Sequence, residues 1–329
     1  MKHISILVPG GDTSLSNLEA TYKMFRMAND HLHRVGQSPL FDVHLVGQTK
    51  DSQVSNDVFS IRPDATIEQV ARTDLIIIPA IHGDIHTILK LNNAFIPWII
   101  RQHQQGAEVA SLCIGAFLLA GTGLLDGKRC ATHWMMTEEF RKMYPEVDLV
   151  DDKIITDESG IYTSGGAYSS LNLNLYLIEK FVGREMAVLS SKIFEIDINR
   201  NSQSPFIIFK GQKDHGDEAV RQAQEYIETH FTEKIPVDKL SGRFAIGRRT
   251  FERRFKKATS NTIIEYIQRV RIEAAKKLLE ADRAGINEVM YDVGYNDVKA
   301  FRELFKKTAG MSPAEYRNRY SKEVIMAIR

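Results

Sequence analysis

The segment Phe251-Glu252-Arg253-Arg254-Phe255-Lys256-Lys257 recurs in pattern fifty residues later as Phe301-Arg302-Glu303-Leu304-Phe305-Lys306-Lys307. Both copies keep Phe-x-x-x-Phe-Lys-Lys. On a helix, two phenylalanines four positions apart form one buried stripe, and the basic residues between and after them face outward. A short apolar helical pattern and a turn precede each copy. The sequence therefore predicts two helix-turn-helix units with basic second helices, which would contact two successive major-groove segments of one DNA duplex.

In each predicted unit a supporting helix is followed by a helix that contacts the bases. We expect the supporting helices at 237–244 and 286–293, and the base-contacting helices at 248–257 and 296–307. Asn296 or Asp297 would cap the latter. A long amphipathic helix at 262–281 would join the two units rigidly. The predicted DNA-contacting residues are Arg248, Arg249, Arg253, Arg254, Lys256, Asn296, Asp297, Lys299, Arg302 and Lys306.

The charge of the chain is unevenly distributed. The whole chain has a formal net charge of +1. Residues 217–329 contain 23 Lys and Arg against 17 Asp and Glu, whereas residues 1–216 contain 20 against 25. The basic excess therefore lies in the part that carries the repeat, as a phosphate-binding surface requires, although solvated helix faces are commonly basic as well.

Residues 1–198 alternate short apolar runs with helical patterns. Strands are predicted at 4–8, 41–46, 74–79, 108–112 and 161–164, and helices at 15–35, 85–105, 114–120 and 170–182. This alternation predicts an α/β domain with a mostly parallel sheet. The polar, turn-rich residues 199–216 are predicted as a linker, with 206–209 as a short docking piece. Residues 217–320 would form the DNA-binding domain, and 321–329 a C-terminal tail.

The composition fits a cytoplasmic globular protein. The chain is 43% hydrophobic and 26% charged, which is ordinary for that class. No apolar segment approaches membrane-spanning length, and the first apolar run is too short for a signal peptide. With only two cysteines, Cys113 and Cys130, a disulfide framework is not expected.

A cysteine stands at a predicted junction between a strand and a helix. Cys113 follows the strand at 108–112, and the small residues Gly115 and Ala116 allow a sharp turn there. A side chain at such a turn is exposed above the carboxyl edge of the sheet, near a helix N-terminus that favours a thiolate. His133 could be its partner. Alternatively, Cys113 is a small buried apolar residue and His133 a polar residue with other partners.

Several stretches resemble known families. These are 113–120, 123–134, 163–166 and the C-terminal segment 294–317. Residues 1–200 resemble the PfpI-type, glutamine-amidotransferase-like domain, and residues 217–320 resemble the AraC/XylS DNA-binding domain. Together they resemble the GlxA family of transcriptional regulators. The resemblance implies a flavodoxin-like parallel-sheet sandwich of the class I glutamine-amidotransferase type, followed by an all-α domain with two helix-turn-helix units.

The sequence departs from the enzymes of that resemblance. Hydrolytic relatives place an acidic residue beside the cysteine, and the best-aligned position here is Asn17, with Glu19 two residues out of register. Asn172 likewise stands where an acid is usual. An amide cannot accept a proton as a carboxylate does. We therefore expect a binding pocket without catalysis, in which Cys113 and His133 are vestigial. The predicted ligand-binding residues are Asn17, Gly83, Asp84, Cys113, Ile114 and His133.

A metal site is a further alternative near that pocket. His82 and His86 are four residues apart, as metal-binding histidines can be, but a third ligand is not evident. Asp84 as the cap of the following helix is the simpler interpretation. We therefore expect no metal and no cofactor.

The leading functional hypothesis is a transcription regulator controlled by a small metabolite. The resemblance suggests an amine or an amino-acid-derived effector. The alternative is a cysteine-dependent hydrolase or amidase using Cys113 and His133, fused to a DNA-binding domain. A third possibility is a redox sensor with an accessible Cys113 thiolate. Expected partners are promoter DNA, RNA polymerase if the protein is an activator, and a second copy of the chain joined through the α/β domain.

Overall fold

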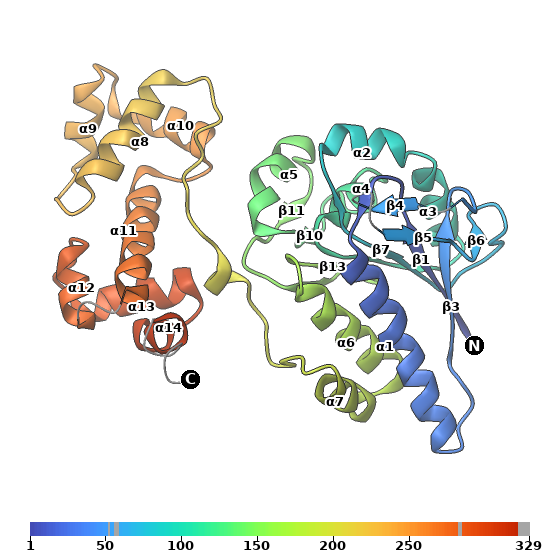
Figure 1. The fold of residues 1–329 in the computed structure, drawn as a ribbon. Helices are drawn as coiled ribbons and strands as arrows, with labels where there is room; N and C mark the ends of the chain where they lie inside the picture. Colours follow the sequence, from blue (N-terminus) through green and yellow to red (C-terminus); the bar gives the residue numbers. More distant parts are fainter. Residues whose placement is uncertain (52, 56–58, 282–284, 322–329) are drawn as a thin grey trace. The chain divides into compact units, whose positions relative to one another are not determined.

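The chain folds into two compact units (Figure 1), and the computed structural model describes residues 1–51, 53–55, 59–281 and 285–321. The units are Met1–Gln203, called the α/β domain below, and Ser204–Arg329, called the helical domain. The boundary between them falls inside the predicted linker 199–216. The predicted tail 321–329 lies outside the described residues, except for Ser321.

A seven-stranded sheet forms the centre of the α/β domain, in the order β12-β13-β9-β7-β1-β3-β6. Its strands are β1 (Lys2–Val8), β3 (Phe41–Gly47), β6 (Ala65–Thr66), β7 (Leu75–Ile78), β9 (Glu108–Ser111), β12 (Ile155–Asp157) and β13 (Ile161–Ser164). Neighbours pair in parallel, except β12 with β13. Short pairs form outside it: β2 (Asp12–Thr13) with β8 (Ile81–His82), β4 (Gln53–Ser55) with β5 (Phe59–Ile61), and β10 (Arg129–Cys130) with β11 (Asp148–Leu149). The mostly parallel sheet confirms the predicted fold class.

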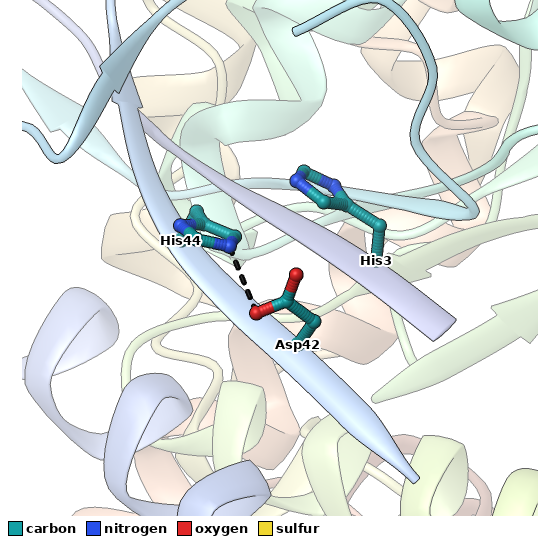
Figure 2. Close-up of side chains that lie close together, drawn as sticks. All are labelled: His3, Asp42 and His44. Carbon is teal, nitrogen blue, oxygen red and sulfur yellow. Dashed lines mark hydrogen bonds and ion pairs between the residues drawn. The ribbon is translucent and has the colours of Figure 1, made fainter. Parts of the chain in front are cut away.

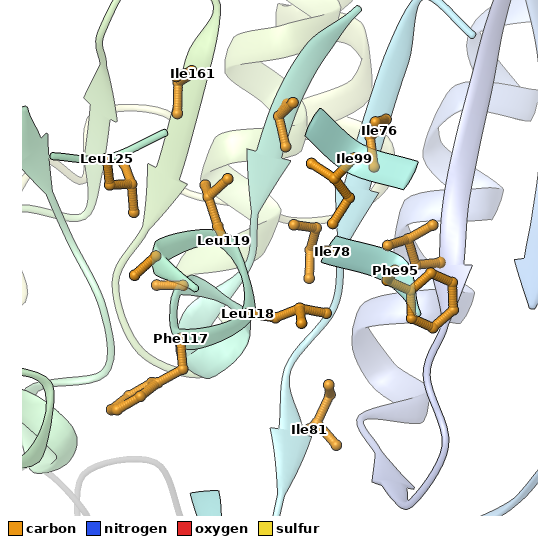
Figure 3. Close-up of a cluster of buried hydrophobic side chains, with 14 of the residues drawn as sticks. Ile76, Ile78, Ile81, Phe95, Ile99, Phe117, Leu118, Leu119, Leu125 and Ile161 are labelled. Atoms are coloured by element: carbon orange, nitrogen blue, oxygen red, sulfur yellow. The ribbon is translucent and has the colours of Figure 1, made fainter. Parts of the chain in front are cut away.

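Helices cover both faces of this sheet (Figure 1). One face carries α1 (Leu15–Arg34), α6 (Ser169–Val182) and α7 (Arg184–Ile193). The other carries α2 (Ile85–Leu91), α3 (Phe95–Gln104), α4 (Ala116–Ala120) and α5 (Thr137–Met143). Because side chains alternate along a strand, Ile4 and Ile6 of β1 enter one core and Leu7 enters the other. Figure 3 shows the second core, in which Ile76 and Ile78 lie near side chains of α3 and α4.

The predicted helix at 85–105 is wrong in one respect, because the structure has two helices there. α2 ends at Leu91 and α3 begins at Phe95. The buried side chain of Asn92 donates from Nδ2 to the carbonyl oxygens of Gly10 (2.9 Å) and Ile88 (3.0 Å), and Oδ1 accepts from the Gly10 amide (2.8 Å). A buried amide needs such partners, so Asn92 fixes the helix end against the loop after β1.

Seven α-helices make up the described part of the helical domain. They are α8 (Glu218–His230), α9 (Val237–Arg243), α10 (Arg248–Thr259), α11 (Ile263–Glu280), α12 (Ile286–Asp292), α13 (Val298–Ala309) and α14 (Pro313–Tyr320). The pairs α9–α10 and α12–α13 are the two helix-turn-helix units. α11 contributes Tyr266 to the core that holds Phe251 and Phe255, and Leu279 to the core that holds Phe301 and Phe305. One long helix thus joins the two units, as predicted.

The second base-contacting helix begins two residues later than predicted. α13 starts at Val298, and Asp297 is its N-cap, accepting hydrogen bonds from the amides of Lys299 (2.8 Å) and Ala300 (3.0 Å). A capping carboxylate satisfies amides that have no partner inside the helix. Asn296 therefore precedes the helix.

Two expectations from composition can be compared with the structure. Cys113 and Cys130 are both free, so no disulfide joins them. None of the described helices is both long enough and apolar enough to cross a membrane.

Replacement of Phe305 by Ala should destabilise the helical domain by about 3–5 kcal/mol. Its ring is fully buried and packs against Phe301 and Tyr316. Urea unfolding of the purified variant measures the change. Lys307→Ala, an exposed position on the same helix, is the control and should change stability by less than about 0.5 kcal/mol. Equal stability of the two variants would contradict this packing.

Candidate functional site

Cys113 lies at the sharp turn that the sequence predicted. It follows β9, begins a short 3-10 helix (Cys113–Gly115) that leads into α4, and has a left-handed backbone with φ of +55°. The turn needs Gly115, because a Cβ atom there would lie 2.6 Å from the carbonyl oxygens of Ile78 and Pro79. The geometry is that of a nucleophile elbow. The expected exposure of the side chain is wrong, however, since only 3% of Cys113 is accessible to solvent.

The polar atoms of Cys113 are engaged by neighbouring residues of the α/β domain. Its Sγ accepts a hydrogen bond from the Ala167 amide (3.4 Å), and its own amide donates to Ser164 Oγ (3.2 Å). Its carbonyl accepts from Thr132 Oγ1 (3.0 Å). Burial raises the pKa of the thiol, even though the Ala167 and Ile114 amides act in the opposite direction. The thiol is therefore neutral near pH 7, contrary to the expected thiolate.

His133 contacts the same turn of the chain but does not bind the cysteine. Its Nδ1 accepts a hydrogen bond from the Met135 amide (3.1 Å), and its ring lies so close to Gly166 that a Cβ atom there would be 2.5 Å from Cδ2. Burial lowers the pKa of His133, and nearby His82 lowers it further. Among the described residues, His133 and Cys113 share no hydrogen bond. The two side chains therefore lack the hydrogen bond that joins a nucleophile to its base.

Asn17 supports this turn from α1. Its Nδ2 donates to Ser170 Oγ (3.1 Å), and its Oδ1 accepts from the Ala80 amide (3.1 Å). Ser170 in turn donates to the Ala167 carbonyl (3.0 Å), so the buried amide of Asn17 stabilises the turn beside Cys113. Asn172 donates to the Asp197 carbonyl (2.7 Å), which is also a structural contact.

The loop 82–84 is exposed. Asp84 caps α2 by accepting from the Thr87 amide (2.8 Å), which confirms the simpler interpretation of this residue. The hydrogen bonds from Thr87 lower the pKa of the Asp84 carboxyl. Gly83 has φ of +124°, a backbone conformation that favours glycine. Within the described residues, no third His, Cys, Asp or Glu joins His82 and His86 to form a metal-binding group.

Gln203 is the residue that sequence reasoning missed. The sequence places it in a polar linker, yet only 1% of it is exposed. Its Oε1 accepts from the Gly166 amide (3.1 Å), and its Nε2 donates to the carbonyls of Thr132 (3.0 Å) and Lys153 (3.2 Å). A Cβ atom at Gly165 would lie 3.0 Å from the side chain of Gln203. No local sequence signal could have revealed these contacts, because they join segments 37 to 71 residues apart.

We call the set Cys113, His133, Gly165, Gly166, Ala167 and Gln203 the Cys113 site. It is closed in this structure, because Cys113 and Gln203 are buried. A large surface groove lies instead in the helical domain, beside α10, with a volume of about 1120 Å³. Its lining includes Asp217, Arg243 and Arg254. Arg254 is paired there with Asp217 through two hydrogen bonds (2.8 and 2.6 Å).

The first helix-turn-helix unit presents its arginines in two ways. Arg248, Arg249, Arg253 and Lys256 are exposed on α10, as the predicted DNA contacts require. Arg248 is paired with Asp238 (3.0 Å) and Glu252 (3.1 Å). Arg254 is held by Asp217, which also caps α8. An arginine held by a carboxylate must lose that partner before it binds a phosphate, so Arg248 and Arg254 differ from the other predicted contacts.

The second unit presents cations without such partners. Lys299, Arg302 and Lys306 are exposed and lie on one face of α13 at spacings of three and four residues. Among the described residues, none of the three forms an ion pair. Asn296 and Asp297 are also exposed just before the helix, although the Asp297 carboxylate is used in the cap. On α13 all three predicted cationic contacts are therefore exposed and outside the ion pairs of the described residues.

Comparisons with known proteins agree with both halves of the chain. Residues 31–180 match the DJ-1/PfpI family, and residues 240–319 match a helix-turn-helix domain family. Two relatives from Pseudomonas aeruginosa are named as HTH-type transcriptional regulators. GbdR is 24% identical over 92% of this chain and 81% of its own length. CdhR is 23% identical over 95% of this chain and 90% of its own length.

Solved structures show the same fold for the α/β part. A putative transcriptional regulator from Vibrio parahaemolyticus has a TM-score of 0.53 at 21% identity, covering 58% of this chain and 98% of that one. An AraC family transcriptional regulator from Pseudomonas putida has a TM-score of 0.51 at 13% identity, covering 59% of this chain and 100% of that one.

A DJ-1/PfpI-type α/β domain followed by two helix-turn-helix units defines a class of two-domain transcription regulators. The chain combines a DJ-1/PfpI domain with a helix-turn-helix domain and is a DNA-binding transcriptional regulator.

In the native protein, Cys113 should react with iodoacetamide at pH 7.5 far more slowly than a free cysteine. Burial raises the pKa of Cys113 and raises that of Cys130 to about 12, so both thiols are protonated and covered. Mass spectrometry of labelled peptides measures the rates. The same protein in urea is the control and should label at both cysteines. Rapid native labelling of Cys113 would revive the hydrolase and redox-sensor alternatives.

Arg302→Ala should weaken specific DNA binding by about 1–3 kcal/mol, because the unpaired guanidinium on α13 is free to contact a base or a phosphate. Arg253→Ala tests α10 in the same way. Gel-shift titrations with a selected promoter fragment measure the affinities. Lys192→Ala removes an exposed cation from the α/β domain and should leave affinity unchanged. Wild-type affinity in both arginine variants would refute the assignment of these helix faces.

Proposed function

We propose that the protein regulates transcription in response to a small metabolite that binds at the Cys113 site. In this proposal the α/β domain is a sensor without catalytic activity. The observation that carries it is the position of Gln203. Its side chain binds the Gly166 turn of the Cys113 site, and the next residue, Ser204, begins the helical domain.

The chain directly after Gln203 is fixed to the second helix-turn-helix unit. A Cβ atom at Gly310, after α13, would lie 3.2 Å from both Ser204 and Pro205. Lys276 of α11 donates to the carbonyl of Ile207, and Arg319 of α14 lies over the Phe206 ring (5.4 Å). A shift of Gln203 would therefore act, through the covalent chain, on a segment packed against α13. In this way an effector bound at the Cys113 site would favour an arrangement of the helical domain that binds DNA.

The chemistry around the site favours a polar or cationic metabolite. The Cys113 thiol is neutral, and the lowered pKa of His133 makes its ring neutral at pH 7. Tyr168, next to Ala167, is 66% exposed, and Trp134 is half-buried beside the His133 ring. Aromatic faces attract cations, which supports an amine or an amino-acid-derived effector. Its binding site would include Asn17, Gly83, Asp84, Cys113, Ile114 and His133.

Because the site is closed, the effector would have to open the Gly165–Gly166 turn. Opening would separate the turn from Gln203 and release the hydrogen bond to the Gly166 amide. The hydrolase alternative lacks support, since a neutral buried thiol without a histidine partner is a poor nucleophile.

The other proposed partners are those that a transcription regulator requires. We expect promoter DNA in the cytoplasm, RNA polymerase if the protein activates transcription, and a homodimer formed through the α/β domain. Two copies would double the length of DNA that is contacted.

Gln203→Ala should uncouple DNA binding from the effector. In wild-type protein, a metabolite selected from a set of amines and amino acids should change promoter affinity by about 5- to 150-fold. In Gln203→Ala, the same metabolite should still bind the α/β domain, measured by calorimetry, but should leave promoter affinity unchanged. Gln104→Ala, an exposed glutamine in the same domain, is the control and should respond as wild type.

The two measurements separate two failures. A wild-type response in Gln203→Ala would reject Gln203 as the connection. The absence of any wild-type response across the whole set would count against metabolite control itself.

A further inference from the structure

Two imidazoles and a carboxylate lie together on the neighbouring strands β1 and β3 (Figure 2). His3 is the second residue of β1, and Asp42 and His44 are the second and fourth residues of β3. In the parallel register His3 is opposite Asp42, and Ser5 is opposite His44. Since alternate residues of a strand share a face, all three side chains project from the same face of the sheet. Each is partly exposed to solvent.

The three side chains are close enough to share one ion after a small adjustment. One nitrogen of each ring and one carboxylate oxygen lie within 4.8 Å of one another. His44 Nε2 is 2.9 Å from Asp42 Oδ1, the contact drawn in Figure 2. The two rings are stacked, with centroids 4.8 Å apart and planes inclined by 14°. A metal ion lies in the plane of each ring that binds it. The His44 ring, whose side chain is 34% exposed, would therefore turn out of the stack.

A buried hydrogen-bond network already orients His3. Its Nδ1 is 3.0 Å from Thr73 Oγ1, and Ser5 Oγ donates to the same hydroxyl (3.0 Å). The Thr73 hydroxyl has one proton, and it is directed to the carbonyls of His3 and Leu75, which can only accept. Ser5 Oγ lies closer to Thr73 Oγ1 (3.0 Å) than to His3 Nδ1 (3.5 Å), so we assign its proton to Thr73. Nδ1 of His3 then donates to Thr73 Oγ1, and Nε2 keeps the lone pair. Metal-binding histidines are usually held in this way, by a hydrogen bond from the other ring nitrogen.

We propose that His3, Asp42 and His44 form a binding site for a zinc-class divalent cation. Two imidazoles and one carboxylate are ligands that Zn²⁺ accepts, whereas Mg²⁺ and Ca²⁺ prefer oxygen ligands alone. Water would complete the coordination on the exposed side. The ion would join β1 to β3, and it would stabilise the folded chain because an unfolded chain does not hold the three ligands together.

This site is independent of the Cys113 site and of the proposed effector. Cys113 follows the carboxyl end of β9, whereas His3, Asp42 and His44 lie within the first four residues of β1 and β3. If the protein does not bind a metal ion at this site, the proposed regulation through the Cys113 site is unaffected.

The test is a calorimetric titration of the full-length, chelator-treated protein with Zn²⁺. We expect one ion per chain. Asp42→Asn and His44→Gln should each weaken binding by at least about tenfold, since even partners that only orient a ligand are worth about 10- to 100-fold. His86→Gln removes an exposed histidine outside the cluster and should bind as wild type. Thermal unfolding of each variant without metal verifies that it is folded.

Co²⁺ provides a second measurement that needs no variant. Cobalt bound by two imidazoles and a carboxylate should show the visible absorption of a four- or five-coordinate ion, and Zn²⁺ should displace it. No stoichiometric binding in wild type would overturn the proposal. Zn²⁺ binding that survives both Asp42→Asn and His44→Gln would also overturn it, because the ion would then be bound without the two proposed ligands from β3.

Discussion

The Cys113 site depends on the turn at Gly165 and Gly166, where close packing leaves no room for a side chain. At Gly166 an added Cβ atom would meet the His133 ring at 2.5 Å, and at Gly165 it would meet the Gln203 side chain at 3.0 Å. The residue after them, Ala167, donates to the Cys113 thiol. Any larger residue at either glycine would displace His133 or Gln203. Because Gly165 and Gly166 have no side chains, Cys113, His133 and Gln203 can all pack around this turn.

The same contacts explain why an enzyme-like turn serves regulation here. The backbone of Cys113 is left-handed, but the thiol is covered and neutral, and the amide of Asn17 supports the turn. In the proposed mechanism, Gln203 senses the position of this loop. Since Ser204 and Pro205 pack against the end of α13, a change at the loop would then act on the second base-contacting helix.

Local patterns predicted the folds of both domains, and non-local contacts account for what they missed. The Phe-x-x-x-Phe repeat located both helix-turn-helix units because a buried helix stripe is visible in sequence. The break at Asn92 was missed because its hydrogen-bond partner, Gly10, lies 82 residues away. The burial of Cys113 and of Gln203 depends on the 165–167 turn. His3 meets Asp42 and His44 only through the sheet register, which sequence patterns do not give.

Both helix-turn-helix units are expected to contact one duplex and to read its sequence. Selection of genomic DNA fragments by the purified protein over a salt series, followed by footprinting of the retained fragments, tests this arrangement. We expect a few fragments to be retained at raised salt, each protected in two major-groove segments about 10 base pairs apart. Binding that disappears uniformly with salt, without preferred fragments or paired protections, would indicate phosphate contact alone and would contradict it.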